Sequence, residues 1–329
     1  MGLGVMVLSY TVGSMFAGIG GICLGFKNTG CTVVWANELD HHACETYRLN
    51  LGDKYLVEGD IYKVDTDDIP DLDILTAGFP CQAFSIAGYR KGFADERGVL
   101  FFEVMRVIKA KRPRVVFLEN VKNLVTHDHG NTFKNITECL MGEGYTLSYK
   151  VLNTSEYGNI PQNRERIYVV AFRNPSDAKG FVFPDPIPPT VGIRDILSKG
   201  KQDDYYYYRE DHPYYPKLTE VMKNRDTVYQ WRRVYVRENK SNECPTLTAN
   251  MGTGGHNVPL ILDDWGIRKL TPEECLRFQG FPKGFGFPEG MANSHKYKQA
   301  GNSVSVPVIQ RIANNIISAM RSTDDGAHI

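Results

Sequence analysis

Short apolar runs alternate with helix-like segments through the first half of the chain, and this alternation constrains the fold more than any other feature. Five runs are rich in β-branched and aromatic residues, at 11–16, 31–37, 73–79, 114–120 and 166–172. Segments with helical periodicity lie between them, such as 41–51 and 100–111. Strands that alternate with helices predict a parallel, doubly wound α/β sheet.

The pattern changes near residue 184, where the proline-rich run FPDPIPPTVG interrupts the alternation. The segment that follows is dense in Tyr and Arg, and it leads into a run rich in Thr and Gly. A helical pattern then returns, and 306–321 has the apolar spacing of an amphipathic helix. We therefore expect a first domain, a smaller domain that is mainly β or irregular, and a return to the first domain, over 1–184, 185–265 and 266–329.

Charge is distributed unevenly along the chain, although the net charge is zero. Residues 31–75 carry eleven acidic and three basic side chains. Residues 88–115 carry eight basic and three acidic side chains, and residues 217–240 carry seven and three. Two separate basic regions favour one electropositive side and an anionic partner, although solvated helix faces give the same pattern.

Seven cysteines are spread along the chain without a C-x-x-C pair. An odd number at irregular spacing is not a disulfide framework, so we expect a reducing, cytoplasmic location. The uncharged N-terminal run lacks the basic start and the small-residue cleavage pattern of an export signal, and we interpret it as a buried strand and turn. We expect neither a metal ion nor a membrane association.

The glycine-rich run FAGIGG at 16–21 follows the first predicted strand and precedes a helix. Glycines there let the backbone bend tightly and approach a ligand. A dinucleotide fingerprint would need glycine where Cys23 stands, which disfavours a dehydrogenase. Glu38 closes the second strand and can accept from both ribose hydroxyls. Asp60 lies in the GDI run at 59–61, which ends a further predicted strand before 73–79. Each acid alone is more often a helix cap, but together they favour an adenosine-bearing cofactor without pyrophosphate, such as S-adenosylmethionine.

The run GFPCQAFS places Cys81 directly after a proline and a predicted strand. Ligands bind at the carboxyl ends of parallel strands, and Glu119 and Asn120 close the next strand on the same side. Arg164 and Arg166 stand at alternate positions before a later strand and so share a face.

A thiol, a carboxyl group and an arginine suit the methylation of cytosine at C5. The thiolate adds at C6, the acid donates to N3, and the arginine holds O2. A cysteine hydrolase would need a paired histidine, and none of the eight histidines has a compelling setting.

The chain resembles the bacterial cytosine-C5 DNA methyltransferases of the restriction–modification type. The resemblance runs from about residue 12 to 320 and rests on motifs in the family's order: FAGIGG, Glu38, GDI, GFPCQAFS, ENV, QNRER, RKLTPEECLRFQGFP and YKQAGNSV. It implies a large domain with a Rossmann-like mixed sheet that binds S-adenosylmethionine, facing a smaller target-recognition domain across a DNA cleft. The implied activity is methyl transfer to C5 of a flipped-out cytosine in a short specific duplex sequence, through a covalent bond between Cys81 and C6.

The resemblance also implies roles for individual residues. Cys81 corresponds to the nucleophile, Glu119 to the acid at N3 and Arg166 to the arginine on the base, with Arg164 nearby for the DNA backbone. The cofactor-binding positions are Phe16, Ala17, Gly18, Gly20, Gly21, Glu38, Leu39, Asp60, Ile61, Phe79, Pro80, Leu100, Asn302, Ser303 and Val304. The substrate-binding positions are Pro80, Gln82, Ser85, Arg97, Asn120, Arg232, Arg233, Arg237, Thr246, Leu247 and Thr248. Leu39 departs from relatives that place an aromatic ring against adenine.

Two alternatives keep this fold but change the function. A catalytically inert DNA-binding relative is disfavoured by the intact Cys81, Glu119 and Arg166. A transfer-RNA methyltransferase of the animal type is disfavoured by the Tyr- and Arg-rich insert. The resemblance implies double-stranded DNA as the partner and a restriction endonuclease as the functional counterpart. We expect a monomer, because one subunit can flip one base per visit and methylate the strands separately.

Overall fold

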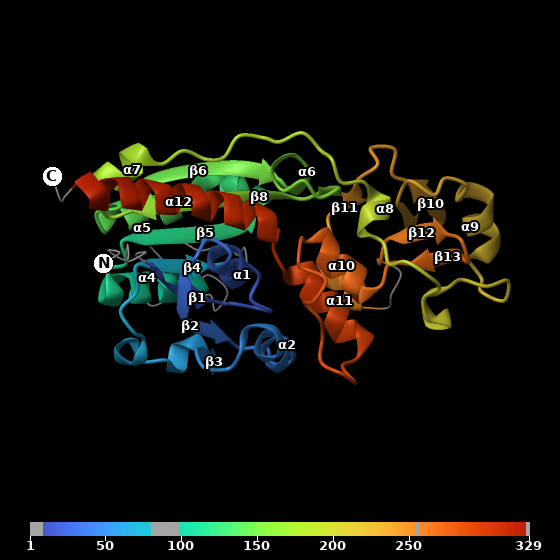
Figure 1. Ribbon diagram of the computed structural model, residues 1–329, viewed down its shortest axis with the longest axis horizontal. Coiled ribbons are helices and arrows are strands. Elements are labelled where there is room, and N and C mark those ends of the chain that lie inside the picture. Colours follow the sequence, from blue (N-terminus) through green and yellow to red (C-terminus); the bar gives the residue numbers. More distant parts are fainter. Residues whose placement is uncertain (1–8, 80–98, 254–256, 327–329) are drawn as a thin grey trace, which may run out of the picture.

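The computed structural model describes residues 9–79, 99–253 and 257–326, in which the chain forms two lobes. Figure 1 shows a large lobe around a long sheet and a small lobe around a second sheet. The helices α10 (Pro272–Phe278) and α11 (Asn293–Asn302) lie between the two sheets. Of the predicted site residues, Pro80, Cys81, Gln82, Ser85 and Arg97 lie outside the described residues.

The large lobe contains a seven-stranded sheet in the order β3-β2-β1-β4-β5-β8-β6. Its strands are β1 (Thr11–Met15), β2 (Thr32–Glu38), β3 (Leu56–Glu58), β4 (Ile74–Ala77), β5 (Val115–Val121), β6 (Thr146–Asn153) and β8 (Glu165–Phe172). The five strands from β3 to β5 are parallel, and β8 runs antiparallel to both of its neighbours. The predicted α/β class is confirmed, and β8 makes the sheet mixed. The apolar runs did not predict β6, because this edge strand is largely exposed.

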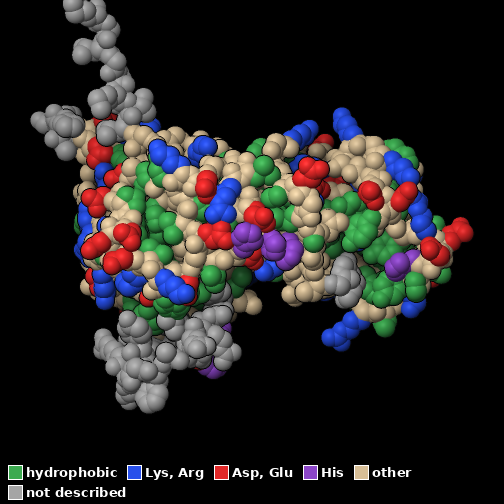
Figure 2. Space-filling model, turned by 90° about the horizontal axis from the view of Figure 1, so that it is seen from below, with side chains coloured by type: hydrophobic (Ala, Val, Ile, Leu, Met, Phe, Trp, Pro, Cys, Tyr) green, Lys and Arg blue, Asp and Glu red, His purple; other side chains and the backbone are tan. Residues whose placement is uncertain are grey.

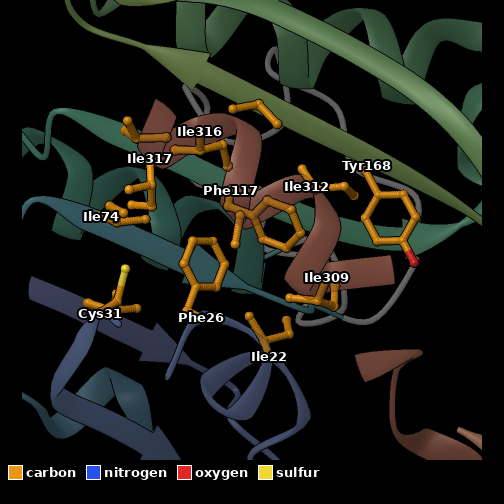
Figure 3. Packing of buried hydrophobic residues seen from close by; sticks show 14 of the residues in the cluster. Ile22, Phe26, Cys31, Ile74, Phe117, Tyr168, Ile309, Ile312, Ile316 and Ile317 are labelled. Carbon is orange, nitrogen blue, oxygen red and sulfur yellow. The ribbon is translucent and has the colours of Figure 1, made fainter. Parts of the chain in front are cut away.

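Side chains alternate across this sheet and build a core on each face. In β5, Val115 and Phe117 join one cluster, whereas Val116 and Leu118 join the other. Helices α1 (Gly21–Lys27) and α12 (Val306–Gly326) cover the first face, and α4 (Val99–Lys111) and α5 (Asn131–Gly142) cover the second. The predicted amphipathic helix at 306–321 is thus confirmed. Figure 3 shows Ile309, Ile312, Ile316 and Ile317 of this helix around the ring pair Phe26–Phe117, whose centroids are 5.4 Å apart.

The small lobe contains a four-stranded sheet in the order β10-β9-β12-β13. Its antiparallel strands are β9 (Tyr229–Arg232), β10 (Tyr235–Glu238), β12 (Leu260–Asp263) and β13 (Gly266–Lys269), and α9 (Tyr215–Val221) packs against them. Because β13 pairs with β12 along its whole length, the small sheet extends past the boundary expected at residue 265.

The remaining elements are a two-residue strand pair, several helices and short turns. The two-residue strands β7 (Gln162–Asn163) and β11 (Cys244–Pro245) pair in parallel. The other short α-helices are α2 (His41–Leu51), α6 (Thr154–Tyr157), α7 (Pro175–Gly180) and α8 (Ile193–Ile196). Short 3-10 turns include Ile61–Lys63 and Ala249–Gly252. In the part of the chain that the structure describes, no helix is long and apolar enough to cross a membrane.

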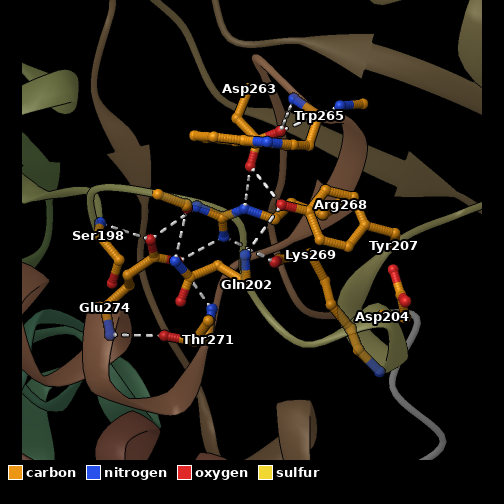
Figure 4. A network of polar contacts seen from close by, with 12 residues as sticks. Ser198, Gln202, Asp204, Tyr207, Asp263, Trp265, Arg268, Lys269, Thr271 and Glu274 are labelled. Atoms are coloured by element: carbon orange, nitrogen blue, oxygen red, sulfur yellow. Dashed lines mark hydrogen bonds and ion pairs between the residues drawn. The ribbon is translucent and has the colours of Figure 1, made fainter.

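A buried ionic network attaches the small sheet to α10 (Figure 4). The fully buried Arg268 donates to Asp263 at 2.6 Å and, through two nitrogens, to Glu274 at 2.7 and 2.8 Å. Glu274 also accepts from the backbone N–H of Thr271, while the Thr271 hydroxyl caps the helix by accepting from the N–H of Glu274. The run RKLTPEE therefore fixes the orientation of β13 relative to α10.

The face of the molecule in Figure 2 shows histidine side chains gathered near its middle. Ring contacts join His41 and His42 of α2 with His295 of α11, and the His42 and His295 centroids are 3.8 Å apart. Asp40, which caps α2 by accepting from two backbone N–H groups, also binds Lys298 of α11 at 2.8 Å. The N-terminus of α2 is thereby held against α11.

Arg114 ties two distant helices to the sheet and gives a first prediction. It forms two hydrogen bonds with the fully buried carboxylate of Asp177 in α7, at 2.6 and 2.9 Å, and one with Asp324 in α12 at 2.7 Å. Arg114→Met should lower the free energy of unfolding by about 3 kcal/mol, because Asp177 would lose its buried cationic partner. Urea unfolding measures this loss. The control Lys134→Met breaks the exposed pair with Glu138 and should cost under about 0.5 kcal/mol. Equal losses would contradict the prediction.

Candidate active site

A cavity of about 360 Å³ opens at the carboxyl ends of β1, β2, β4 and β5. Open parallel sheets bind their ligands at this edge. The cavity brings together residues predicted separately for the cofactor and for the chemistry, namely Phe16, Ala17, Gly18, Gly21, Glu38, Phe79, Glu119, Asn120, Arg164, Arg166, Asn302, Ser303 and Val304. One site therefore contains both sets.

The glycine run after β1 makes a tight turn at the floor of this cavity. Gly20 has φ 88°, and a Cβ there would lie 2.2 Å from Leu51 in α2, so no other residue fits without displacement. A Cβ at Gly21 would lie 2.9 Å from the Ser303 hydroxyl, so this glycine lets the turn approach 303–304 closely. Gly20 does not line the cavity. Glycine is needed at this position because a side chain would clash with α2.

Glu38 holds the same turn in place through its carboxylate. One oxygen accepts from the N–H of Gly18 at 2.7 Å, and the other accepts from the N–H groups of Leu39 and Asp40 at 2.9 and 2.8 Å. A carboxylate has about four acceptor sites, so three internal bonds leave capacity for a ligand hydroxyl. Glu38 thus shapes the glycine turn and also presents charge to the cavity that it lines.

Four other predicted cofactor residues that the structure describes lie outside the cavity. Asp60 is at the end of β3, two strands away from β1, where it caps a 3-10 turn by accepting from the N–H of Tyr62. Ile61 is buried, Leu39 is 68% exposed, and Leu100 packs against the core beneath α4. Their cofactor roles stay predictions.

Glu119 and Arg166 form the charged centre of the cavity. The antiparallel register pairs Glu119 with Tyr168 and Val121 with Arg166, so Glu119 and Arg166 are diagonal neighbours on one face. The Arg166 Nε lies 3.3 Å from a carboxylate oxygen of Glu119, which is 7% exposed. Burial raises the pKa of Glu119, while Arg166 and Arg164 oppose this rise. A carboxyl group that keeps its proton more readily than usual suits the predicted proton donor.

Arg164 uses its guanidinium on the protein backbone, and its expected role beside the DNA backbone stays a prediction. Its guanidinium donates to the carbonyls of Leu247 at 2.8 Å, of Gly301 at 3.4 Å and of Ser303, and the residue is 2% exposed. Burial and the neighbouring Arg166 lower the pKa of Arg164 to about 9, so the guanidinium stays charged at neutral pH. Arg164 reaches the carbonyl of Leu247 because the β7–β11 pairing brings the chain before β8 beside the chain after Cys244.

Asn120, predicted to bind substrate, uses its amide on the protein backbone. Its Nδ2 donates to the carbonyl of Phe79 at 2.7 Å, and its Oδ1 accepts from the N–H of Val121 at 2.8 Å. Phe79 is the last residue that the structure describes before Cys81. Asn120 thus fixes the chain that leads to the predicted nucleophile.

The other predicted substrate-binding residues that the structure describes divide into two groups. Arg232, Arg233 and Arg237 are exposed on and around the β9–β10 hairpin. In residues 246–248, hereafter the recognition segment, the Thr246 hydroxyl donates to the carbonyl of Asn163 at 2.6 Å and Thr248 is exposed. Leu247 is 1% exposed within an apolar cluster, so its predicted substrate contact is not available to its side chain.

The sequence reasoning missed several residues of the cavity wall, among them Asp40, Val121, Lys298 and Gly301. Two signals could have found them: Asp40 follows Glu38 at a helix start, and Lys298 and Gly301 belong to the YKQAGNSV motif. In the described part of the chain, no group of three or more His, Cys, Asp or Glu side chains could hold a metal ion.

A Rossmann-like mixed sheet with a glycine turn after β1, an acid at the end of β2, and a buried pair of Glu119 in β5 and Arg166 in β8 defines a methyltransferase type of fold. Within this class, the chain belongs to the C-5 cytosine-specific DNA methylase family, whose pattern matches residues 10–318. The predicted family, fold class and enzyme class are thereby confirmed.

The chain is similar to named bacterial enzymes over nearly its full length. It is 58% identical to the Type II methyltransferase M.Bsp6I of Bacillus sp. (strain RFL6), with 94% of this chain and 99% of that relative covered. It is 44% identical to the Type II methyltransferase M.HaeII of Haemophilus aegyptius, with 94% of each covered. The fold matches the crystal structure of the S. pombe Dnmt2 methyltransferase with a TM-score of 0.71 and 20% identity, over 94% of this chain and 99% of that one.

The buried Glu119 gives a prediction about stability and pH. Because its pKa in the folded state lies above its ordinary value of 4.5, the folded protein keeps a proton that the unfolded chain loses as pH rises. The contribution of Glu119 to the stability of the wild type therefore falls between pH 4.5 and the folded-state pKa and then levels off. Glu119→Gln does not titrate, so its stability relative to wild type should rise through this interval, by about 1.4 kcal/mol per pKa unit. Urea unfolding at several pH values measures the difference, with the exposed Glu138→Gln as control. A difference independent of pH would contradict the prediction.

Proposed function

We propose that this chain transfers the methyl group of S-adenosylmethionine to C5 of a flipped-out cytosine in a short, specific duplex DNA sequence. The observation that carries the proposal is the buried Glu119–Arg166 pair, which shares one cavity with Glu38 and the glycine turn. The family and the Type II relatives support the same reaction.

The cavity fits S-adenosylmethionine in its chemistry. Glu38 keeps acceptor capacity for ribose hydroxyls, Gly18 and Gly21 allow close backbone approach, and Asn302 and Ser303 add polar groups beside the glycine turn. When bound, the cofactor supplies an electrophilic methyl group on a sulfonium.

The proposed chemistry of the protein residues begins at Cys81. Its thiolate forms a bond to C6 of cytosine, and the electron pair of the C5–C6 double bond becomes available at C5. Glu119 donates its proton to N3 as negative charge develops there, and Arg166 holds O2. After C5 has gained the methyl group, a base removes the C5 proton, the double bond re-forms and the thiolate leaves. The raised pKa of Glu119 supports its part in this sequence.

The target cytosine must leave the double helix for this addition, because C6 is inaccessible within a stacked duplex. We infer that the exposed arginines of the β9–β10 hairpin contact the DNA, since phosphate contacts position a protein on a duplex. The proposal further includes a cytoplasmic monomer that acts as the modification partner of a restriction endonuclease. It assigns residues 185–265, extended by β13, to target recognition.

The decisive experiment is a covalent trap with 5-fluorocytosine. Sequencing of 5-methylcytosine in plasmid from cells that express the protein first identifies the methylated position. A duplex with 5-fluorocytosine at that position should form an adduct that survives denaturing electrophoresis only when S-adenosylmethionine is present. Fluorine cannot leave as a cation, so the reaction stops with the Cys81–C6 bond intact.

The controls of this trap separate the alternatives. Cys81→Ala should bind the duplex but form no adduct, and peptide mapping of the wild-type adduct should place it within GFPCQAFSIAGYR. A label on Cys23, Cys31 or Cys44 would show that the nucleophile is assigned wrongly. Methylation of transfer RNA in place of duplex DNA would establish the alternative substrate.

Glu38 allows a separate test of the cofactor site. In Glu38→Gln, an amide N–H₂ replaces one carboxylate oxygen and opposes the N–H groups that now donate to it. We expect the Kd for S-adenosylmethionine to rise about 10- to 100-fold, the effect of losing hydrogen bonds to a charged group. Calorimetric titration measures the Kd, and Glu45→Gln on the half-exposed side of α2 should leave it unchanged. An unchanged Kd in Glu38→Gln would place the cofactor elsewhere.

A further inference from the structure

Arg164 touches two segments that are far apart in the sequence and belong to different parts of the site. One nitrogen of its guanidinium donates to the carbonyl of Leu247 in the recognition segment. The other donates to the carbonyls of Gly301 and Ser303 at the end of α11. Ser303 lines the cavity, whereas the recognition segment does not. One buried side chain therefore joins the cavity wall to a segment outside it.

Gln162 binds the backbone N–H of Leu247, the residue whose carbonyl Arg164 binds. Its side-chain oxygen accepts from the N–H of Leu247 at 3.2 Å, and its nitrogen donates to the carbonyl of Phe278 at the end of α10. Gln279, which also contacts Gln162, donates to the carbonyl of Ala300 at 3.0 Å. Both backbone groups of Leu247 are thus bound by side chains from the two positions that flank Asn163.

The recognition segment and the end of α11 are also in direct backbone contact. A Cβ at Gly301 would lie 2.1 Å from the carbonyl carbon of Thr248 and 2.2 Å from its oxygen. Real Cβ atoms do not approach backbone this closely, so only glycine permits this packing. A shift of Gly301 must therefore displace Thr248 or break the contact.

The charge of Arg164 is costly to bury on carbonyl oxygens alone. Buried ions usually require an opposite charge with good geometry. Within the described residues, the Arg164 Nε has no hydrogen-bond partner, and the ion pair with Glu119 is made by Arg166. A neutral side chain could fill the same space without this cost, which favours a role for Arg164 beyond packing.

We propose that Arg164 is a positioning residue that couples cofactor binding to the placement of the recognition segment. The proposal rests on the proposed function in one respect, that the recognition segment serves the DNA. A ligand that orders Asn302 and Ser303 orders the carbonyl that Arg164 binds, and Arg164 passes this constraint to Leu247. Coupling of this kind is reciprocal, so a duplex that orders the recognition segment tightens the cofactor site by the same factor.

Hydrogen–deuterium exchange measures this coupling without DNA. The probe is S-adenosylhomocysteine, which occupies the site without reacting. In the wild type we expect its addition to slow amide exchange both in 17–22, at the cavity, and in the recognition segment, outside it, the latter about fivefold or more. In Arg164→Met the slowing in 17–22 should persist, and the slowing in the recognition segment should disappear.

The matched control is Arg173→Met, at the far end of β8. Arg173 is exposed and also donates to a backbone carbonyl, that of Arg112, so the same substitution there should leave both effects intact. The proposal is overturned if the wild-type recognition segment does not respond to the probe, or if Arg164→Met retains the response.

Two further variants keep the test decisive if Arg164→Met does not fold. Arg164→Lys retains the charge, but one ammonium cannot span the Leu247 and Ser303 carbonyls, so the response should fall. Gly301→Ala retains the guanidinium and forces Thr248 away from α11, so it should also weaken the response. Wild-type responses in both folded variants would refute the coupling.

A second measurement separates coupling from a general loss of structure. It is the ratio of the Kd values for S-adenosylhomocysteine without and with a duplex that contains the methylated sequence. Substitution of a residue that only stabilises the fold should change both Kd values and leave their ratio unchanged. Arg164→Met, in contrast, should bring the ratio close to one. A failed covalent trap would refute the proposed reaction, and an unchanged ratio would refute only the coupling.

Discussion

The antiparallel pairing of β5 with β8 is the constraint on which the rest of the site depends. A purely parallel sheet would place the start of β8, and Arg166 with it, at the opposite edge from Glu119. Because β8 runs the other way, its first residues reach the edge where β1, β2 and β4 end, and Arg166 meets Glu119 at 3.3 Å. The same reversal brings 162–164 to this edge, where the β7–β11 pair connects them to the recognition segment. One strand direction thus sets both the charged centre and its link to the small lobe.

The walls of the cavity are held by hydrogen bonds and ion pairs between segments that are far apart in the sequence. Glu38 fixes the glycine turn, Asn120 fixes the chain at Phe79, and Lys298 joins Asp40 across the rim. The Arg268–Glu274 network then sets the orientation of the small sheet on α10. Each contact uses a polar side chain of one motif on the backbone or side chain of another. The relative positions of the motifs therefore depend on a few hydrogen bonds and ion pairs between them rather than on the loops that join them.

The sequence predicted the parts of this arrangement that follow from strand ends. Glu119 closes an apolar run at the edge where parallel strands bind ligands, so its place in the site could be expected. Arg166 begins a later run, and it meets Glu119 only because β8 is antiparallel, which the alternation of strands and helices did not predict. The role of Arg164 could not be expected either, because its partner Leu247 is 83 residues away and depends on a two-residue strand pair. Leu247 was assigned to the substrate from its motif, although an apolar side chain beside α10 and α11 buries itself. β6 was missed because an exposed edge strand needs no apolar run.

Burial and the adjacent arginines act on Glu119 in opposite directions, and the two together suit the proposed reaction better than either influence would alone. Burial by itself would keep the carboxyl group protonated, and an adjacent arginine by itself would keep it ionised. Burial is the larger influence here, and Arg166 and Arg164 reduce it. In the proposed reaction, a proton held this way would pass to the ring nitrogen as the thiolate adds, and the two guanidinium groups would stabilise the carboxylate left behind. Removing the charge of Arg164 would therefore weaken that stabilisation as well as the link to the recognition segment, which explains why a charged residue is buried at this position.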